Sequence, residues 1–469
     1  MKLYLTVLPI TAFFLAGCKL GPEFAVPNVP VGRTWKQGTA LKGASLPDTW
    51  WRLFNDRELN RLVDRALAAN NDLAAAKSRV DTARALVGLD RARMFPTLDL
   101  NGSAGITRAS QDATAGQLPP GVNIPLENQR YRGTFDLAYD PDLWGRNKRL
   151  LEASNAEAAA AEALLDSQRL GLATEVARQY FLLRGLDAQK TVLVDTIASR
   201  KETLDLQKSK ADAGLIDGLS TSQARTELEL ANNDLAAVER QRGSAEHALA
   251  VLCGSRPSDF SVTNRGTSGA LPGIRAGLPA EVLSRRPDVR AAEQNLRAAN
   301  ARIGVAEAAF YPSFSLSAGG GFESLEVSRF LDWENRVLSL GAGIAAPVFN
   351  GGSNKANFDT AFSRRDESLA SYRNTLLTAL REVEDALVDL KGLARSRNSL
   401  ELALTSTEET LRLSKERFEK GLTSYFEVVD AERDSLRIQL SLSQIDAEQR
   451  ITLAALAKSL GGGWNSNLE

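Results

Sequence analysis

Four short segments alternate apolar and polar residues at period two, and this alternation constrains the fold more than any other feature of the chain. The segments are residues 98–106, 133–140, 313–318 and 338–344. Alternation of this kind predicts β-strands with one apolar and one polar face. The runs are close to the roughly 9–11 residues with which a strand crosses a lipid bilayer. Almost all of the remaining sequence indicates helix, so a mainly helical chain with four membrane-type strands is expected.

The two faces of these strands differ in chemistry. Asp99, Asp136 and several serines are expected to line water, whereas the opposite face, expected to contact lipid, carries Phe135, Leu137, Phe314 and Leu316. An open sheet would leave two unpaired edges in lipid, and the smallest spanning barrels have about eight strands. Chains must therefore pool their strands, with eight from two copies or twelve from three.

The N-terminus predicts where the protein is sent. Lys2 is followed by an apolar run to Leu15, too short to span a membrane as a helix, and then by Ala16-Gly17-Cys18. This pattern is typical of a secretory signal peptide. Its end resembles a bacterial lipobox, which implies that Cys18 becomes the lipidated first residue of the mature protein. Lys19, where an aspartate would signal retention in the inner membrane, favours the outer membrane.

Composition offers little for other chemistries. Lys and Arg number 57 against 58 Asp and Glu, which gives no reason to expect nucleic-acid binding. With Cys18 lipidated, Cys253 has no disulfide partner and is expected to be a buried small hydrophobe. His247 is the only histidine. No nucleophile motif, phosphate loop or metal-type spacing surrounds it, so no catalytic residue, metal or cofactor is expected beyond the covalent lipid.

The sequence contains two related halves. Residues 93–100 resemble 309–316, residues 140–145 resemble 346–351, and residues 213–215 resemble 420–422. Each half is expected to form a helix, two strands, a long helix, a glycine turn and a second helix. The long helices, at residues 146–210 and 351–420, lack internal proline. The predicted divisions are a signal peptide (1–17), an N-terminal equatorial segment (18–55), the first repeat (56–254), an equatorial linker (255–279), the second repeat (280–461) and a tail (462–469).

These features together resemble one family. The lipobox, the repeat, Phe310-Tyr-Pro-Ser313, Pro347 to Gly352, and Arg417 to Ala431 are similar to the TolC/OprM-like outer membrane factors of tripartite efflux pumps, in the NodT-like lipoprotein branch. The resemblance implies a homotrimer with a twelve-stranded β-barrel and a long periplasmic α-helical barrel. It also implies docking to a periplasmic adaptor and an inner-membrane pump of the RND type, export of drugs or other small toxic compounds, and no enzymatic activity.

The resemblance also implies roles for particular residues. Gly214 and Leu215, with Gly421 and Leu422, match the hairpin tips that meet the adaptor. Glu427 and Asp430 match the acidic constriction at the periplasmic end. Their spacing of three places both on one helix face, and three chains would form two stacked carboxylate rings that attract cations. The alternative interpretation is a solvated acidic pair stabilised by the helix N-terminus.

Two other functions remain open from the sequence. The same channel could serve a type I protein secretion system. A coiled-coil envelope lipoprotein without a pore is a further alternative, although the alternating strands argue against it. The lipobox favours efflux, and the exported substrate is not encoded in any recognisable motif.

Overall fold

The computed structural model describes residues 19–30, 32, 34–36, 46–110, 126–263, 270–274, 276 and 278–462. The predicted signal peptide and Cys18 lie outside these residues. The described chain forms two compact units. The strand unit contains residues up to Pro27 together with Asp81–Ala160 and Glu293–Ala370, and the helical unit contains Asn28–Val80, Ala161–Ala292 and residues from Ser371 onward.

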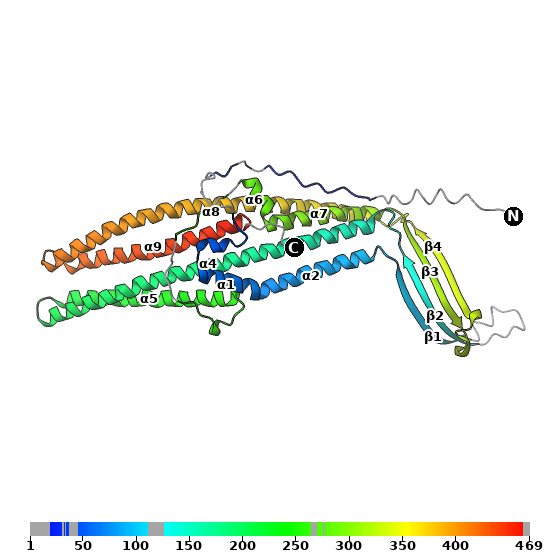
Figure 1. Cartoon of the computed structure of the whole chain (residues 1–469), viewed down its shortest axis with the longest axis horizontal. Helices are drawn as coiled ribbons and strands as arrows, with labels where there is room; N and C mark the ends of the chain where they lie inside the picture. Colours follow the sequence, from blue (N-terminus) through cyan, green and yellow to red (C-terminus); the bar gives the residue numbers. More distant parts are fainter. Residues whose placement is uncertain are drawn as a thin grey trace, which may run out of the picture. The chain divides into compact units, whose positions relative to one another are not determined.

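The strand unit is built on one antiparallel sheet. Its strands, in spatial order, are β1 (Thr97–Arg108), β2 (Glu127–Tyr139), β3 (Ser313–Ser324) and β4 (Arg336–Ala345) (Figure 1). All four predicted strands are confirmed. β2 begins at Glu127, six residues earlier than the alternation indicated. Residues 127–132 do not alternate apolar and polar side chains, and they form strand because they pair with the end of β1.

Helices carry the chain to and from the sheet. α2 (Asn71–Ala92) and α7 (Pro287–Ala308) precede β1 and β3, while α4 (Arg146–Asp212) and α8 (Ser353–Glu419) follow β2 and β4. Inside the strand unit α4 and α7 pack through small side chains, and the cluster consists of Ala153, Ala156, Ala298 and Ala301. Small residues allow two helix backbones to approach closely.

The helical unit contains two helical hairpins, in which α4 is followed by α5 (Gly218–Leu252) and α8 by α9 (Tyr425–Ser459) (Figure 1). The long helices have 67 residues each and their partners 35 each. These equal lengths agree with the repeat predicted from the sequence. No helix among the described residues is both long enough and apolar enough to cross a membrane.

Each half begins with two helices, where the sequence predicted one. α1 (Arg57–Ala69) is separated from α2 at Asn70, whose side-chain oxygen accepts a hydrogen bond from the Leu73 amide at 3.0 Å. α6 (Pro279–Arg285) is separated from α7 at Arg286, because Pro287 disfavours helical backbone at the residue before it. The two breaks occupy corresponding places in the two halves.

The core of the helical unit surrounds the start of α1. The Tyr180 hydroxyl donates to the Asp56 carboxylate, which also accepts from the amides of Glu58 and Leu59 and so caps the helix. Burial, together with the hydrogen bond to Asp56, raises the pKa of Tyr180 above its usual value. Cys253 is buried in the same core, as predicted, and burial raises the pKa of its thiol.

Gly254 closes α5 with a left-handed backbone, φ +63°, and a Cβ there would lie against the carbonyl oxygen of Ala69, far inside van der Waals contact. Gly254→Ala is therefore expected to lower the free energy of unfolding by about 2 kcal/mol or more. Gly243→Ala is the control, because Gly243 lies within α5 with open space around it. That change should stabilise the helix by roughly 0.5–1 kcal/mol. Thermal unfolding followed by circular dichroism in detergent distinguishes them, and equal effects would contradict the packing.

Candidate functional site

One face of the sheet is apolar over most of its length and largely uncovered, with polar side chains only toward the end farthest from the helices. In the strand register Leu100 lies opposite Phe135, and Phe314 lies opposite Ile344, so their side chains share a face. Several members of this face are at least 65% exposed: Leu98, Leu100, Ile106, Leu338, Leu340 and Ile344. A contiguous apolar surface of this kind requires an apolar environment. The face composition predicted from the alternation is confirmed.

The opposite face is polar. Asp99 lies opposite Asp136, and Asn101 lies opposite Thr134. The Asn101 amide donates to the Asp136 carboxylate at 2.7 Å, and the Thr134 hydroxyl donates to the same oxygen at 3.0 Å. β3 and β4 add serines and glycines to this face. At Gly341, for example, a Cβ would lie only 2.8 Å from the Ser317 hydroxyl. The result is a low, hydrogen-bonding surface suited to water.

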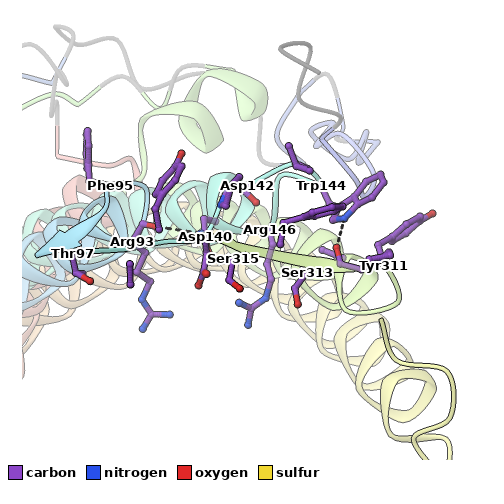
Figure 2. A pocket seen from close by; sticks show the side chains of 18 of the residues that line it. Arg93, Phe95, Thr97, Asp140, Asp142, Trp144, Arg146, Tyr311, Ser313 and Ser315 are labelled. Atoms are coloured by element: carbon purple, nitrogen blue, oxygen red, sulfur yellow. Dashed lines mark hydrogen bonds between the residues drawn. The ribbon is translucent and has the colours of Figure 1, made fainter. Parts of the chain in front are cut away.

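A cavity of about 600 Å³ lies in the strand unit where the helices meet the strands (Figure 2). The Trp144 indole donates to the Pro312 carbonyl at 2.6 Å, and its ring centre is 4.9 Å from that of Tyr311. In Figure 2 the side chains of Arg93 and Arg146 both extend downward in the view, away from Trp144. Amphipathic aromatic side chains at the end of an apolar face are typical of a membrane–water boundary.

A buried arginine holds the residues that follow Cys18. Arg149, with no exposed surface, donates from Nε to the Leu20 carbonyl at 2.7 Å and from Nη2 to the Gly21 carbonyl at 2.8 Å. A Cβ on Gly21 would lie 2.5 Å from the Gly304 Cα. The start of α4 and the C-terminal part of α7 thus fix this short segment within the strand unit. The sequence alone did not predict these roles of Arg149 and Gly304.

The two glycine turns end the long helices as predicted. Gly214 and Gly421 have left-handed backbones, φ +69° and +70°. In each turn the amide of the following leucine donates a hydrogen bond to a carbonyl in the last turn of the helix. Leu215 donates to the Lys210 carbonyl and Leu422 to the Arg417 carbonyl, both at 2.9 Å. Leu215 and Leu422 are 73% and 67% exposed. The helix-ending role is confirmed, and adaptor docking at these tips stays a prediction.

The predicted gate residues lie at the start of α9. Glu427 and Asp430 are exposed, whereas Tyr425, Val428 and Val429 are buried in a cluster with α4 and α5 residues. The acidic pair therefore faces outward from its hairpin, available to a neighbour or to solvent. A ring formed with other chains stays a prediction. Burial raises the pKa of Tyr425 to about 12, and nearby Glu432 contributes.

A buried carboxylate next to this cluster joins three helices. Glu227 of α5 is 3% exposed and pairs with Arg200 of α4 at 3.2 Å and with Arg433 of α9 at 2.9 Å. Arg200 also donates to the Glu227 carbonyl at 2.6 Å. The sequence did not predict this group, because Arg433 lies 206 residues away from Glu227 along the chain.

Residues examined for catalytic chemistry do not assemble into a site. His247 is exposed on α5, and Cys253 is buried at the end of the same helix. Within the ranges that the structure describes, no group of three or more His, Cys, Asp or Glu side chains could hold a metal ion.

Known proteins resemble this chain over nearly its whole length. The sequence matches the family described as outer membrane efflux protein over residues 62–255 and 278–462. It is 34% identical to the solvent efflux pump outer membrane protein SrpC of Pseudomonas putida, over 98% of each chain. The structure is similar to the outer-membrane channel OprN, with a TM-score of 0.88, 31% identity, and coverage of 95% of this chain and 100% of that one. It is also similar to the CmeC outer membrane channel of Campylobacter jejuni, with a TM-score of 0.88, 25% identity and 96% coverage of both.

The paired charges near the α9 start generate a ranked prediction. Glu227→Ala removes the carboxylate from buried Arg200 and should cost roughly 3–5 kcal/mol of stability. Arg433→Ala should cost about 0–1 kcal/mol, because its side chain is 49% exposed and Glu227 keeps Arg200. Arg437→Ala, whose side chain is 76% exposed, is the control and should have no measurable effect. Thermal unfolding midpoints test this order, and equal losses for Glu227→Ala and Arg433→Ala would contradict it.

Proposed function

The chain belongs to the outer membrane efflux protein family, and from this premise we propose that three copies form the exit duct of a tripartite efflux pump. The observation that carries the proposal is the sheet, which has an uncovered apolar face, a polar face, and pairing at β1 and β4 on one side only. In lipid the unpaired edges must meet strands of other chains. The outer membrane location of the family supplies that lipid.

Three copies suit the chemistry of the polar face better than two. Barrels of about eight strands are filled by their own side chains, whereas larger barrels can hold water. The polar face carries Asp99 and Asp136, which favour a hydrated lumen over a packed interior. Twelve strands from three chains, four from each, give a lumen wide enough for water and small solutes.

The helical hairpins supply surfaces for partners. Under this proposal their exposed tips at Gly214 and Gly421 meet a periplasmic adaptor, which connects the duct to an inner-membrane pump of the RND type. SrpC is a solvent efflux protein by name. We therefore favour small toxic compounds, solvents included, as the cargo. Transport of this kind is driven by the pump and requires no catalytic residue in the duct.

The N-terminal segment supports lipidation at Cys18. The segment Lys19–Glu23 that follows it is held in the strand unit by Arg149 and by the Asn300 amide, which donates to the Pro22 carbonyl at 2.8 Å. A lipid on Cys18 would thus be attached to the same unit that carries the apolar sheet face. A single acyl chain binds membranes only marginally, so the barrel provides the lasting attachment.

The deciding experiment measures assembly and conduction together. The full-length protein is expressed with its own signal, purified in detergent, sized by light scattering and inserted into planar bilayers. A trimer with stepwise conductance is expected. A monomer, or a trimer that conducts nothing under any voltage, would overturn the proposed duct.

Docking at the tips predicts a selective loss of efflux. Gly421→Glu places charge and bulk at an exposed turn, where no atom lies within 4 Å of the missing Cβ. Assembly should therefore be normal while efflux, measured as resistance to a toxic solvent, is lost. Gly392→Glu makes the same chemical change on an exposed part of α8 and should leave efflux intact. Full resistance with Gly421→Glu at normal expression would remove the tip from the docking surface.

The acidic pair predicts the ionic preference of the duct. A ring of like charges attracts cations, so the open channel should be cation-selective and sensitive to divalent ions. Glu427→Gln with Asp430→Asn should weaken both properties while leaving the fold unchanged. Glu408→Gln, at an exposed position of α8, is the control for lost charge alone. Single-channel recording in asymmetric KCl, with and without a divalent salt, tests this prediction. If neither the reversal potential nor the divalent block changes, Glu427 and Asp430 are ordinary surface charges.

A further inference from the structure

The turn between β3 and β4 carries four large apolar side chains that the described part of the chain leaves open. Leu325, Val327, Leu331 and Trp333 are 60%, 69%, 73% and 70% exposed. Turns at the end of a sheet are usually polar, since they meet water. This segment, residues 325–335, instead places an apolar cluster at the far end of the strands from the helices, and we call it the rim ledge.

The rim ledge is fixed to the apolar face of the sheet. A Cβ on Gly133 would lie 3.0 Å from the Phe330 ring, so Phe330 covers that glycine. Gly133 lies opposite Gly102 and Phe322 in the register and shares the face of Phe135. Phe322 and Phe330 have ring centres 6.2 Å apart. The ledge therefore continues the apolar face past the end of the strands.

Several polar groups of the rim ledge have partners within or next to the turn. The Asn335 amide donates to the Arg329 carbonyl at 2.6 Å, and Arg336 donates to the Trp333 carbonyl at 2.7 Å. Arg329 pairs with Asp332 at 3.2 Å. Such pairing lowers the cost of placing these groups near lipid. The side chains of Glu326 and Glu334 are exposed, and carboxylates are favourable only where headgroups and water can reach them.

Both faces of the sheet carry charge at this end. Arg132 and its opposite Glu323 lie on the polar face and pair at 3.4 Å. On the other face Arg108 pairs with Glu127 at 2.8 Å, and the guanidinium of Arg336 lies 4.6 Å from the centre of the Trp333 ring. Paired charges, and a cation beside an indole, are favourable at a boundary between hydrocarbon and water. This end of the apolar face therefore has the chemistry of a lipid boundary.

We propose that the rim ledge is immersed in the outer leaflet and that the acyl chains of membrane lipid are its partner. The inference rests on the proposed duct, because it takes the apolar sheet face as the lipid-facing side. It adds that the membrane contact of each chain extends beyond its strands into this turn. Leu331 and Trp333 then sit at the depth where acyl chains give way to headgroups.

The test measures what touches Leu331 in a bilayer. Leu331→Cys is labelled with an environment-sensitive fluorophore in the full-length trimer, and the protein is placed in vesicles of phosphatidylcholine or of the same lipid brominated near the headgroup end of its acyl chains. The unsubstituted protein gives the background from Cys18 and Cys253. Asn128→Cys, on the polar face of β2, is the matched control. Conductance of the same samples reports separately on the duct itself.

Brominated lipid is expected to quench about half or more of the Leu331→Cys emission, and aqueous iodide little of it, with the opposite order for Asn128→Cys. Quenching of the Leu331 label by iodide alone would overturn lipid contact. Shielding from both quenchers would also overturn it, since a neighbouring chain would then cover the ledge. If the unsubstituted protein does not conduct, the proposed duct is wrong. The quenching data then still decide whether lipid contacts the rim ledge.

Discussion

Hydrogen bonding of the backbone in lipid is the constraint on which the rest of this structure depends. β1 and β4 each pair on one side only, so each presents a row of amide and carbonyl groups without a partner among the described residues. Every such group left in hydrocarbon costs several kcal/mol. The uncovered apolar face is a second constraint, because exposing it to water is unfavourable. The sheet can satisfy both constraints only when copies of the chain close it within a membrane.

The helical unit meets a different requirement, which is the pairing of buried charge. Asp187 has no exposed surface and accepts from Arg242 of α5 at 2.6 Å and from Arg184 of α4 at 3.0 Å. Breaking one partner of such a group is far more costly than the net gain from forming it. Sliding one helix by a turn would leave these charges unpaired. The ion pairs therefore specify the register of a hairpin whose small, repetitive apolar residues alone would specify it weakly.

What the sequence could predict follows from how local each signal is. The strands and long helices were predictable because period two and the absence of proline act within a few residues, and Gly214 and Gly421 because a left-handed turn is a local property. The buried role of Glu227 was not predictable, since its partner Arg433 lies 206 residues away. Residues 127–132 lack alternation and become strand only through their pairing with β1. The proposed acidic ring and closed barrel would be formed by several chains, so neither is a property of one chain's local sequence.

Arg149 holds the segment that follows Cys18 through both backbone and side chain. It donates to the main-chain carbonyls of Leu20 and Gly21 and pairs with the Glu23 carboxylate at 3.1 Å. Gly21 and Gly304 permit the close approach, and any larger residue at either position would push the segment out. If the segment left, Arg149 would keep its pair with Glu152 but would lose the acceptors of its Nε and Nη2 groups. The segment that follows Cys18 and the sheet both belong to the strand unit. The tips and the acidic pair belong to the helical unit, so the proposed membrane attachment and the proposed partner contacts lie in separate units of the chain.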